Sequence, residues 1–384
     1  MLFDTVARQV GRTMPSPVRE WVRGHREDDL PSPEVRPSTI AKWWIDEYLL
    51  QQEIAMSRMR LPTTDFRRRL RDELGQGLDL FSERGWLRDP ASYHLDPPTP
   101  TADEITITDR RDMGVPYERL RMPSHYVPHA DEPGRDRWLS YSRNATATAY
   151  LLRHPGPPRP WIVCQNGYRT GFPLTDFGTF GVKRLHHSLG LNVAVNVAPL
   201  HGPRREGMSG DRVMFSGAMN LVHLGAQAAW DLRRLLAWIR TDQGAPAVGT
   251  WGISLGGMIV ALTAALDGDQ ACVIAGVPEP DLARGMRRNV EGMLPPFYEQ
   301  WGLSWNSLER VTSVVSPLAL DPLVPADNRF IFAGLVDRWV RPGNVAALID
   351  HWGDPHVCWY PGSHLSFGRE PTVRAFIDDA LGRL

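Results

Sequence analysis

The chain has 384 residues, of which 42% are hydrophobic and 23% charged, and these values are ordinary for a folded globular protein. Its 43 lysines and arginines nearly balance 44 aspartates and glutamates, so the formal net charge of −1 argues against broad electrostatic attraction to nucleic acid or to anionic lipid. The length suits one large α/β domain with an addition.

The three cysteines, Cys164, Cys272 and Cys358, are odd in number and lie far apart in apolar, strand-like segments. This pattern predicts reduced, buried thiols in a cytoplasmic protein rather than a disulfide. The first residues, MLFDTVARQVGRTMPSP, contain no continuous apolar stretch, so we expect no signal peptide. We also expect no membrane span, since no uncharged apolar stretch approaches about 18 residues.

Two helices are predicted near the N-terminus, at about residues 39–59 and 64–83, because apolar residues recur there at steps of three and four. A proline-rich joint, LDPPTPTADE, follows them. We therefore predict an N-terminal helical extension over residues 1–100 and a main domain over residues 101–384. Trp43 and Trp44 of the first helix could line the substrate cavity or form the surface of a homo-oligomer, and the sequence leaves both open.

From about residue 105 the pattern becomes an alternation of strands and helices. Nine segments are predicted as strands: ITIT, YERLRM, ATATAYLLRH, WIVCQNGY, LNVAVNVAPL, AVGTWGI, ACVIAGV, RFIFAGLVD and HVCWYPG. Helices are predicted at residues 217–240, 255–266, 344–352 and 371–381. Strands that alternate with helices of ten to fifteen residues or longer indicate an α/β fold whose mostly parallel sheet is covered by helices on both faces.

The stretch GTWGISLGG places Ser254 between a predicted strand and a predicted helix, with Gly252 and Gly256 two residues away on either side. This G-x-S-x-G spacing is typical of a nucleophile elbow, in which a sharp strand-to-helix turn exposes a strained serine. The helix N-terminus then faces the serine, where its partial positive charge favours an oxyanion. We therefore predict Ser254 as the nucleophile and the backbone N–H of Leu255 as one oxyanion donor.

A serine hydroxyl needs a base, and the base needs an orienting acid. The expected chain order is Ser, then Asp or Glu, then His, each after a strand. Asp337 follows the strand RFIFAGLV and His364 follows the strand HVCWY, so we predict these two as acid and base. Glu279 and Asp281, which follow the preceding strand, are the alternative acids. A structural role is expected for His351 and His356.

The second oxyanion donor is predicted in the loop QNGYRTG after the strand WIVCQ, where glycines free the backbone to turn its N–H groups inward. We nominate Tyr168, with Gly167 as the alternative. An ordinary glycine turn is almost equally compatible with this loop.

An insertion of some forty residues, at about 278–317, interrupts the strand–helix alternation and is rich in Met, Trp, Phe and Pro. It lies where a lid is expected, and Met286, Phe297 and Trp301 are predicted to contact an acyl chain. These side chains could equally attach the insertion to the body of the protein, and both roles are compatible.

The elbow at 252–256, the Asp337 loop and the His364 loop resemble those of the α/β-hydrolase superfamily, over residues 105–384. The resemblance implies an eight-stranded, mostly parallel sheet and a Ser254–His364–Asp337 triad. Many members have His-Gly after the third strand, where this chain has Asn166-Gly167; its His-Gly stands one strand later, in APLHGPRREG. That stretch is similar to the dienelactone-hydrolase and acyl-peptidase side of the superfamily.

Arg204, in the same stretch, could bind a substrate phosphate or carboxylate with Arg205, although pairing with acidic residues is the interpretation we favour. Together these features predict a serine hydrolase for a carboxylic ester or thioester of a moderately apolar acyl group. No metal or organic cofactor is expected, because no His, Cys or carboxylate cluster has metal-ligand spacing. An acyltransferase with the same residues and an inactive scaffold with the same fold are the alternatives.

Overall fold

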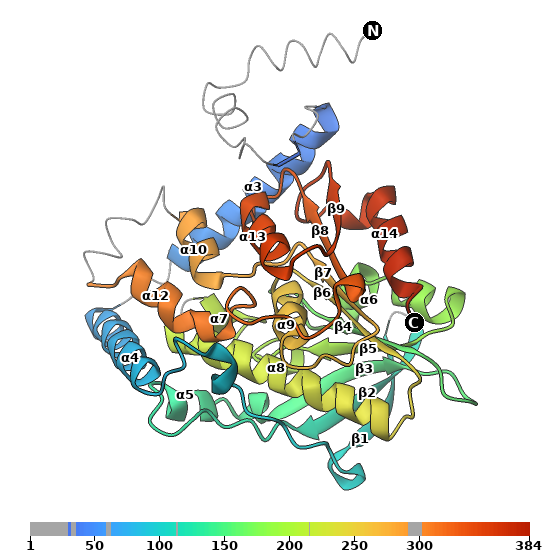
Figure 1. Cartoon of the computed structure of the whole chain (residues 1–384), viewed down its shortest axis with the longest axis horizontal. Coiled ribbons are helices and arrows are strands. Elements are labelled where there is room, and N and C mark those ends of the chain that lie inside the picture. The colour runs from blue at the N-terminus through green and yellow to red at the C-terminus, as the bar shows by residue number, and fades with distance from the viewer. Residues whose placement is uncertain (1–29, 32–35, 59–62, 113, 215, 291–301) are drawn as a thin grey trace.

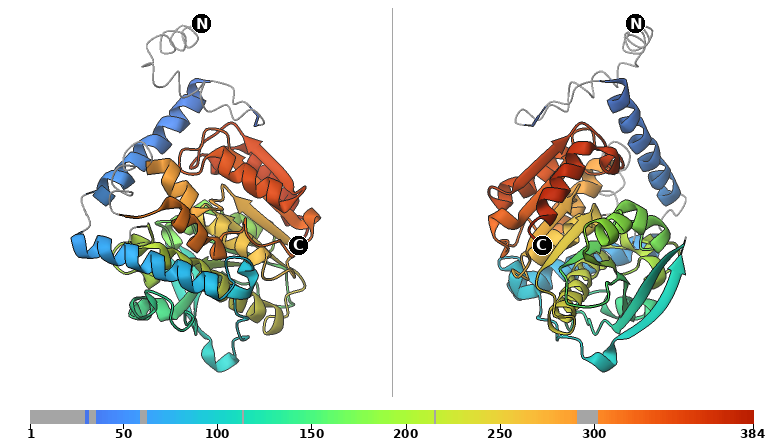
Figure 2. Two further views of the ribbon diagram at one scale, coloured as in Figure 1. Left: turned by 60° about the vertical axis from the view of Figure 1, so that its left-hand side comes forward. Right: turned by 90° about the vertical axis from the view of Figure 1, so that its right-hand side faces the viewer.

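The computed structural model of the protein describes residues 30–31, 36–58, 63–112, 114–214, 216–290 and 302–384. Within these ranges, a twisted sheet lies between two layers of helices, and the N-terminal helices flank this three-layer body (Figures 1 and 2). None of the described helices combines the length and apolar character that crossing a membrane requires.

The described residues form a nine-stranded sheet with the spatial order β1-β2-β3-β5-β4-β6-β7-β8-β9. From β1 to β5 the neighbours pair antiparallel, whereas every pairing from β5 through β4 to β9 is parallel. The carboxyl ends of β4, β6, β7, β8 and β9 therefore lie at one edge of the sheet, where ligands bind in open α/β sheets. The strands are β1 (Thr106–Asp112), β2 (Val115–Pro123), β3 (Thr146–Leu152), β4 (Trp161–Gln165), β5 (Asn192–Val197), β6 (Val248–Ile253), β7 (Cys272–Gly276), β8 (Arg329–Gly334) and β9 (His356–Tyr360).

The central strands consist of near-continuous apolar runs, because helices cover both of their faces. Every residue of β4, β6 and β7 is buried. The predicted α/β sheet is confirmed, and each of the nine predicted segments forms a strand. The family resemblance implied eight strands, whereas the described sheet has nine. At its antiparallel end β1 pairs with β2, and β2 pairs with β3.

Helices on each face of the sheet bury one apolar side against it (Figure 1). The first face carries α8 (Ala218–Thr241), α9 (Leu255–Ala264) and α13 (Pro342–Trp352), and the second carries α6 (Pro173–Thr179), the π-helical turn η4 (Arg184–Ser188) and α14 (Pro371–Leu381). Short helices in the connections are η1 (Pro90–Tyr93), η2 (Ala102–Glu104), α5 (Arg135–Leu139), η3 (Ser142–Ala145), η5 (Gly202–Arg204), α7 (Asp211–Met214), η6 (Ser313–Val315), η7 (Ala326–Asn328) and η8 (Phe367–Arg369). The three cysteines are free.

The N-terminal helices α3 (Pro37–Arg58) and α4 (Thr64–Glu83) form close to where the sequence predicts them. Thr63 caps α4 by accepting a hydrogen bond from the backbone N–H of Phe66. α4 packs on α8 through an apolar cluster that includes Leu74, Phe81 and Met219. α3 instead leaves several large apolar side chains exposed, so the homo-oligomer surface stays a prediction; these are Trp44, Ile45, Tyr48 and Leu49.

The insertion contains α10 (Leu282–Val290) and α12 (Trp305–Thr312), whereas Phe297 and Trp301 lie outside the described residues. Trp305 and Leu308 are buried in a small cluster with Ala283, and α12 packs against α4 and α8. The part of the insertion that is described therefore uses its apolar side chains to attach to the body.

Candidate active site

Ser254 occupies the turn between β6 and α9 with φ 58° and ψ −117°, a conformation that non-glycine residues rarely adopt. Its neighbours are buried, but Ser254 is only half-buried. The flanking glycines are required by the backbone: a Cβ on Gly252 would lie 2.0 Å from the Gly256 carbonyl oxygen, and one on Gly256 would lie 2.1 Å from the Gln165 carbonyl oxygen. The local geometry is therefore that of a nucleophile elbow.

Asp337 and His364 are bonded to each other at the same edge of the sheet. The Nδ1 of His364 lies 2.7 Å from Oδ2 of Asp337, and both side chains are almost fully buried. The other oxygen, Oδ1, accepts hydrogen bonds from the backbone N–H groups of Trp339 and Val340, each at 2.8 Å. Since a carboxylate only accepts, Nδ1 carries the proton and Nε2 of His364 presents its lone pair.

The electrostatic environment of His364 suits a general base. Burial, the largest influence, lowers the pKa of the imidazole, but the charge of Asp337, the hydrogen bond to Asp337 and the charge of Asp46 together outweigh it. The pKa of His364 is therefore raised above its ordinary value of 6.5. With a raised pKa the imidazole binds a proton more strongly than an ordinary histidine does, which favours proton transfer from a hydroxyl.

The parallel strands place these residues together. Ser254 follows β6, Asp337 follows β8 and His364 follows β9, all at the carboxyl edge. Backbone hydrogen bonds tie the loops to one another, from Ser254 N–H to the Gly276 carbonyl at 2.8 Å and from Val336 N–H to the Gly362 carbonyl at 3.0 Å. Within the described residues no hydrogen bond joins Ser254 to His364, and such catalytic contacts often tighten only when substrate binds.

The loop after β4 lies directly against the elbow. A Cβ on Gly167 would lie 3.8 Å from Cβ of Ser254. Among the described residues, the backbone N–H groups of Leu255, Gly167 and Tyr168 donate to no protein acceptor. Unpaired N–H donors beside the elbow serine are what the predicted oxyanion hole requires.

Asn166, which stands where many α/β-hydrolases have histidine, shapes this loop. Its side chain is fully buried; Oδ1 accepts from Ala198 N–H at 2.7 Å, and Nδ2 donates to the Gly167 carbonyl at 2.8 Å. The amide thus turns the Gly167 carbonyl toward itself and fixes the backbone that carries the predicted donors.

Arg204 does not offer its guanidinium to a substrate. The side chain is fully buried and bonded to Asp231 at 2.7 Å, to the Val197 carbonyl at 3.0 Å and to the Asn144 carbonyl at 2.9 Å. Arg204 therefore pairs with an acidic residue, as the sequence analysis favours. It supplies hydrogen bonds to a buried carboxylate and to two buried carbonyl groups. The possibility that Arg204 binds substrate is therefore wrong, since its buried guanidinium is bonded to Asp231.

The alternative acids and bases have other partners. Both oxygens of the buried Glu279 accept from Nδ2 of Asn344, at 3.0 and 3.1 Å, and burial is the main reason why its pKa rises to about 8. Asp281 accepts from Arg284 N–H at 2.9 Å at the start of α10. His351 is bonded to the Leu320 carbonyl, and the ring of His356 stacks on Phe330. Of the three predicted or alternative acids, Asp337 is the one whose carboxylate is bonded to the imidazole of His364.

Two residues of α3 reach this edge, and neither was predicted as a site residue. Asp46 is fully buried and accepts a hydrogen bond from the backbone N–H of His364 at 2.6 Å. Glu53 accepts from the hydroxyl of Tyr168 at 3.0 Å and pairs with Arg169. A signal did exist, since Asp46 is an acid inside the apolar stretch WWIDEYLL, but periodicity does not say what such a residue contacts.

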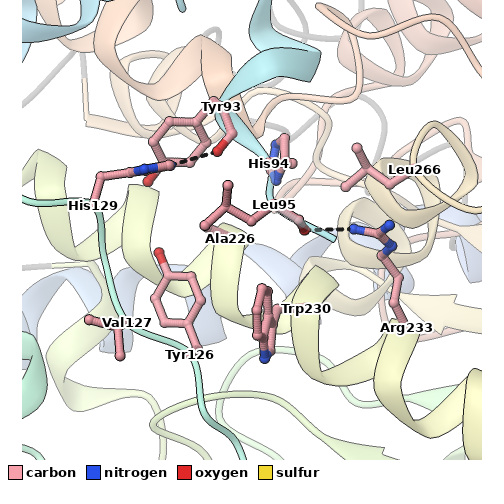
Figure 3. Close-up of a pocket in the computed structure, with 10 residues that line it drawn as sticks. All are labelled: Tyr93, His94, Leu95, Tyr126, Val127, His129, Ala226, Trp230, Arg233 and Leu266. Atoms are coloured by element: carbon pink, nitrogen blue, oxygen red, sulfur yellow. Dashed lines mark hydrogen bonds between the residues drawn. The ribbon is translucent and has the colours of Figure 1, made fainter. Parts of the chain in front are cut away.

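A cavity of about 20 Å³ lies elsewhere, between η1 and α8, and is lined by residues that include Tyr93, Tyr126, His129 and Trp230 (Figure 3). His129 is bonded to the Tyr93 carbonyl across it at 2.8 Å. This volume holds about one water molecule, so the cavity is too small for an ester. Among the described residues, no three His, Cys, Asp or Glu side chains converge to form a metal site.

No family model matches the chain. Two proteins of Mycobacterium tuberculosis, the uncharacterized protein Rv2627c of strain H37Rv and the uncharacterized protein MT2702 of strain CDC 1551, are each 38% identical to it over 363 residues, covering 93% of this chain and 85% of theirs.

Solved structures with a similar fold include acetyl xylan esterase 1 from Thermoanaerobacterium sp. JW/SL YS485, with a TM-score of 0.52, and the acetyl xylan esterase from Paenibacillus sp. R4, with a TM-score of 0.53. Each is 14% identical to the chain and aligns with 77% of it, and the alignments cover 93% and 99% of the two esterases. At this identity the likeness shows the fold alone. The chain thus belongs to the family of the two mycobacterial proteins and has the α/β-hydrolase fold.

Proposed function

We propose that the protein is a serine hydrolase that cleaves a carboxylic ester or thioester of a moderately apolar acyl group. The observation that carries the proposal is the bonded Asp337–His364 pair at the sheet edge where Ser254 stands in its strained elbow. An elbow serine without such a pair would be a packing feature, whereas the three groups together match the roles of nucleophile, base and orienting acid.

In the proposed reaction Ser254 Oγ attacks the acyl carbon while Nε2 of His364 accepts the hydroxyl proton. Asp337 stabilises the imidazolium that forms, and the N–H groups of Leu255 and of Tyr168 or Gly167 bind the oxyanion. The imidazolium then gives its proton to the leaving alcohol or thiol. In the second half, His364 takes a proton from water, the hydroxide adds to the acyl-enzyme, and Ser254 recovers its proton as the carboxylic acid leaves.

The acyl side of the site is proposed near the insertion. Met286 is partly buried against the core and against the Ala283–Trp305–Leu308 cluster, so it sits between the insertion and the body. The similar solved structures include acetyl xylan esterases, and short acyl esters therefore belong among the first substrates to test. The proposals for Phe297 and Trp301 as acyl contacts, and for the insertion as a lid, stay predictions.

A fluorophosphonate probe tests the proposal directly, because it reacts with an activated serine and not with an ordinary one. We expect stoichiometric labelling of the native protein and none of Ser254→Ala. The same two proteins are then assayed with p-nitrophenyl esters from acetate to decanoate, and Ser254→Ala should lower turnover by about 10⁴-fold or more.

Other results lead to other functions. Native protein that is folded, unlabelled and inactive on the whole ester panel contradicts the hydrolase and favours an inactive scaffold. Labelling accompanied by faster acyl transfer to added alcohol than to water favours an acyltransferase, which uses the same triad with a different acceptor.

A further inference from the structure

Helix α3, the blue helix labelled in Figure 1, contacts the loops that follow β8 and β9 through Asp46. Its acidic residues contact two separate loops of the candidate active site: Asp46 the His364 loop, and Glu53 the loop after β4. These residues are seven positions apart, or about two helical turns, so they lie on the same side of the helix.

The carboxylate of Asp46 accepts four hydrogen bonds from the loops that carry the predicted base and acid. Oδ2 accepts from the backbone N–H of His364 at 2.6 Å and of Arg338 at 3.4 Å. Oδ1 accepts from the hydroxyl of Ser363 at 3.0 Å and from the backbone N–H of Leu365 at 3.4 Å. One side chain therefore fixes three consecutive residues around His364 and the residue that follows Asp337.

Burying a carboxylate costs free energy unless hydrogen bonds and charges compensate for it. Asp46 is fully buried, and burial together with the nearby charge of Asp337 raises its pKa to about 6. The charge also acts on its neighbour, since Asp46 is one of the influences that raise the pKa of His364. A neutral residue would fill the same space without the cost of burying a charge, but it would not supply the negative charge that acts on His364.

The other charged groups around Asp46 are mostly neutralised by partners. Glu47 pairs with Arg338, and Lys42 with Glu370. Tyr360 donates its hydroxyl to the Ser363 carbonyl. Asp337 and Asp46 are thus the two carboxylates that act directly on the imidazole of His364.

We propose that Asp46 is a positioning residue of the proposed hydrolase: its carboxylate fixes the backbone of His364 and adds negative charge that stabilises the imidazolium formed during catalysis. The inference rests on the proposed function and extends it to the N-terminal helix. Glu53 holds the loop after β4 in a similar way, because it accepts hydrogen bonds from Tyr168 and Arg169. Helix α3 therefore contacts both sides of the site.

Asp46→Asn tests the proposal, because asparagine keeps the size of the side chain but replaces one acceptor oxygen with a donor and removes the charge. We expect kcat per labelled active site to fall about 10-fold, and about 100-fold in Asp46→Ala, with KM changed less than about 2-fold. The acidic limb of the kcat/KM profile should also move to lower pH, because His364 loses a neighbouring negative charge. Asp65→Asn, which removes an exposed carboxylate from the neighbouring helix α4, is the control and should leave kcat and the pH profile unchanged.

Counting active sites with the fluorophosphonate separates positioning from folding. If Asp46→Asn has a smaller labelled fraction but an unchanged kcat per site, Asp46 only supports the fold, and the proposal is overturned. An unchanged kcat together with an unchanged pH profile in Asp46→Asn also overturns it. If Asp46→Asn does not fold, Ser363→Ala removes one donor to the carboxylate, and kcat should fall about 3-fold; an unchanged kcat there also contradicts the proposal. Native protein that neither labels nor hydrolyses esters would instead overturn the hydrolase itself.

Discussion

The two oxygens of Asp337 have different partners, and this division decides the effect of a substitution there. Oδ1 is bonded to two backbone N–H groups, and Oδ2 to Nδ1 of His364. An asparagine at this position would keep its single oxygen toward the two backbone donors. Its NH₂ group would then face the imidazole and require Nδ1 to be the acceptor.

Asp337→Asn should therefore trap His364 in the tautomer whose proton is on Nε2, where it cannot accept the proton of Ser254. We expect kcat/KM to fall by about 10³- to 10⁴-fold with little change in thermal stability, measured by ester hydrolysis and by circular dichroism melting. The exposed Asp327→Asn is the surface control. Undiminished turnover in Asp337→Asn would assign the acid role to another residue, and Asp46 would be the first to test because its charge also acts on His364.

In native protein the raised pKa of His364 fixes the direction of the pH dependence. As the proposed base, His364 must be neutral to accept a proton, so kcat/KM should rise with pH through an apparent pKa above 6.5. Because Asp337, Asp46 and His364 lie together, this value belongs to the coupled group rather than to the imidazole alone.

At the scale of secondary-structure elements, β6, α9 and the loop after β4 approach so closely that glycine is required between them. The Gly256 position lies against the Gln165 and Asn166 carbonyl oxygens, at the base of the loop that carries the predicted oxyanion donors. A side chain there would push this loop away from the elbow. The closeness of these elements thus couples packing to the geometry of the candidate oxyanion hole.

Gly256→Ala should consequently lower kcat by at least about 100-fold and destabilise the fold by about 1–3 kcal/mol. Gly75→Ala, at an exposed position of α4 with no neighbour within 4 Å, is the matched control and should stabilise the protein by about 0.5–1 kcal/mol without changing activity. Measurements of turnover and of urea unfolding check both. If Gly256→Ala and Gly75→Ala had the same effect on turnover and on the free energy of unfolding, the close approach at Gly256 would not be required for activity or stability.

The strands, the long helices and the elbow could be predicted because each depends on local periodicity or on a short spacing. The alternation of apolar runs located β4 to β9, and the strand–Ser254–helix context located the turn. The contact between Asp46 and His364 could not be predicted, since it joins residues 318 positions apart and depends on how α3 is oriented on the body. The role of Arg204 depended in the same way on which acid, Asp231, its guanidinium meets.

At the scale of the whole molecule, buried carboxyl groups make stability depend on pH. Burial is the main influence that raises the pKa of Glu279 to about 8 and those of Asp46 and Asp176 to about 6. A carboxyl group whose pKa is higher in the folded than in the unfolded state stabilises the fold while it is protonated. That contribution is lost as pH rises from the ordinary pKa to the folded one.

Glu279→Gln isolates the largest of these effects, because Asp46 and Asp176 are common to both proteins. Between pH 4.5 and 8 the folded native protein retains a proton on Glu279 that the unfolded chain releases. The free energy of unfolding of the native protein should therefore fall, relative to Glu279→Gln, by up to about 1.4 kcal/mol per pH unit over this range and stay level above it. Urea unfolding at five pH values measures the difference, and parallel curves would mean that Glu279 titrates normally.

The edge of the sheet formed by β1 has a consequence for how the protein behaves at high concentration. An unpaired outer strand can recruit a strand from another molecule and start aggregation. Along β1 the residues Asp109, Arg110, Arg111 and Asp112 carry charges of both signs, and the first three are exposed. A second molecule that added a strand there would have to desolvate these charges, so the open side of the sheet resists growth into fibrils.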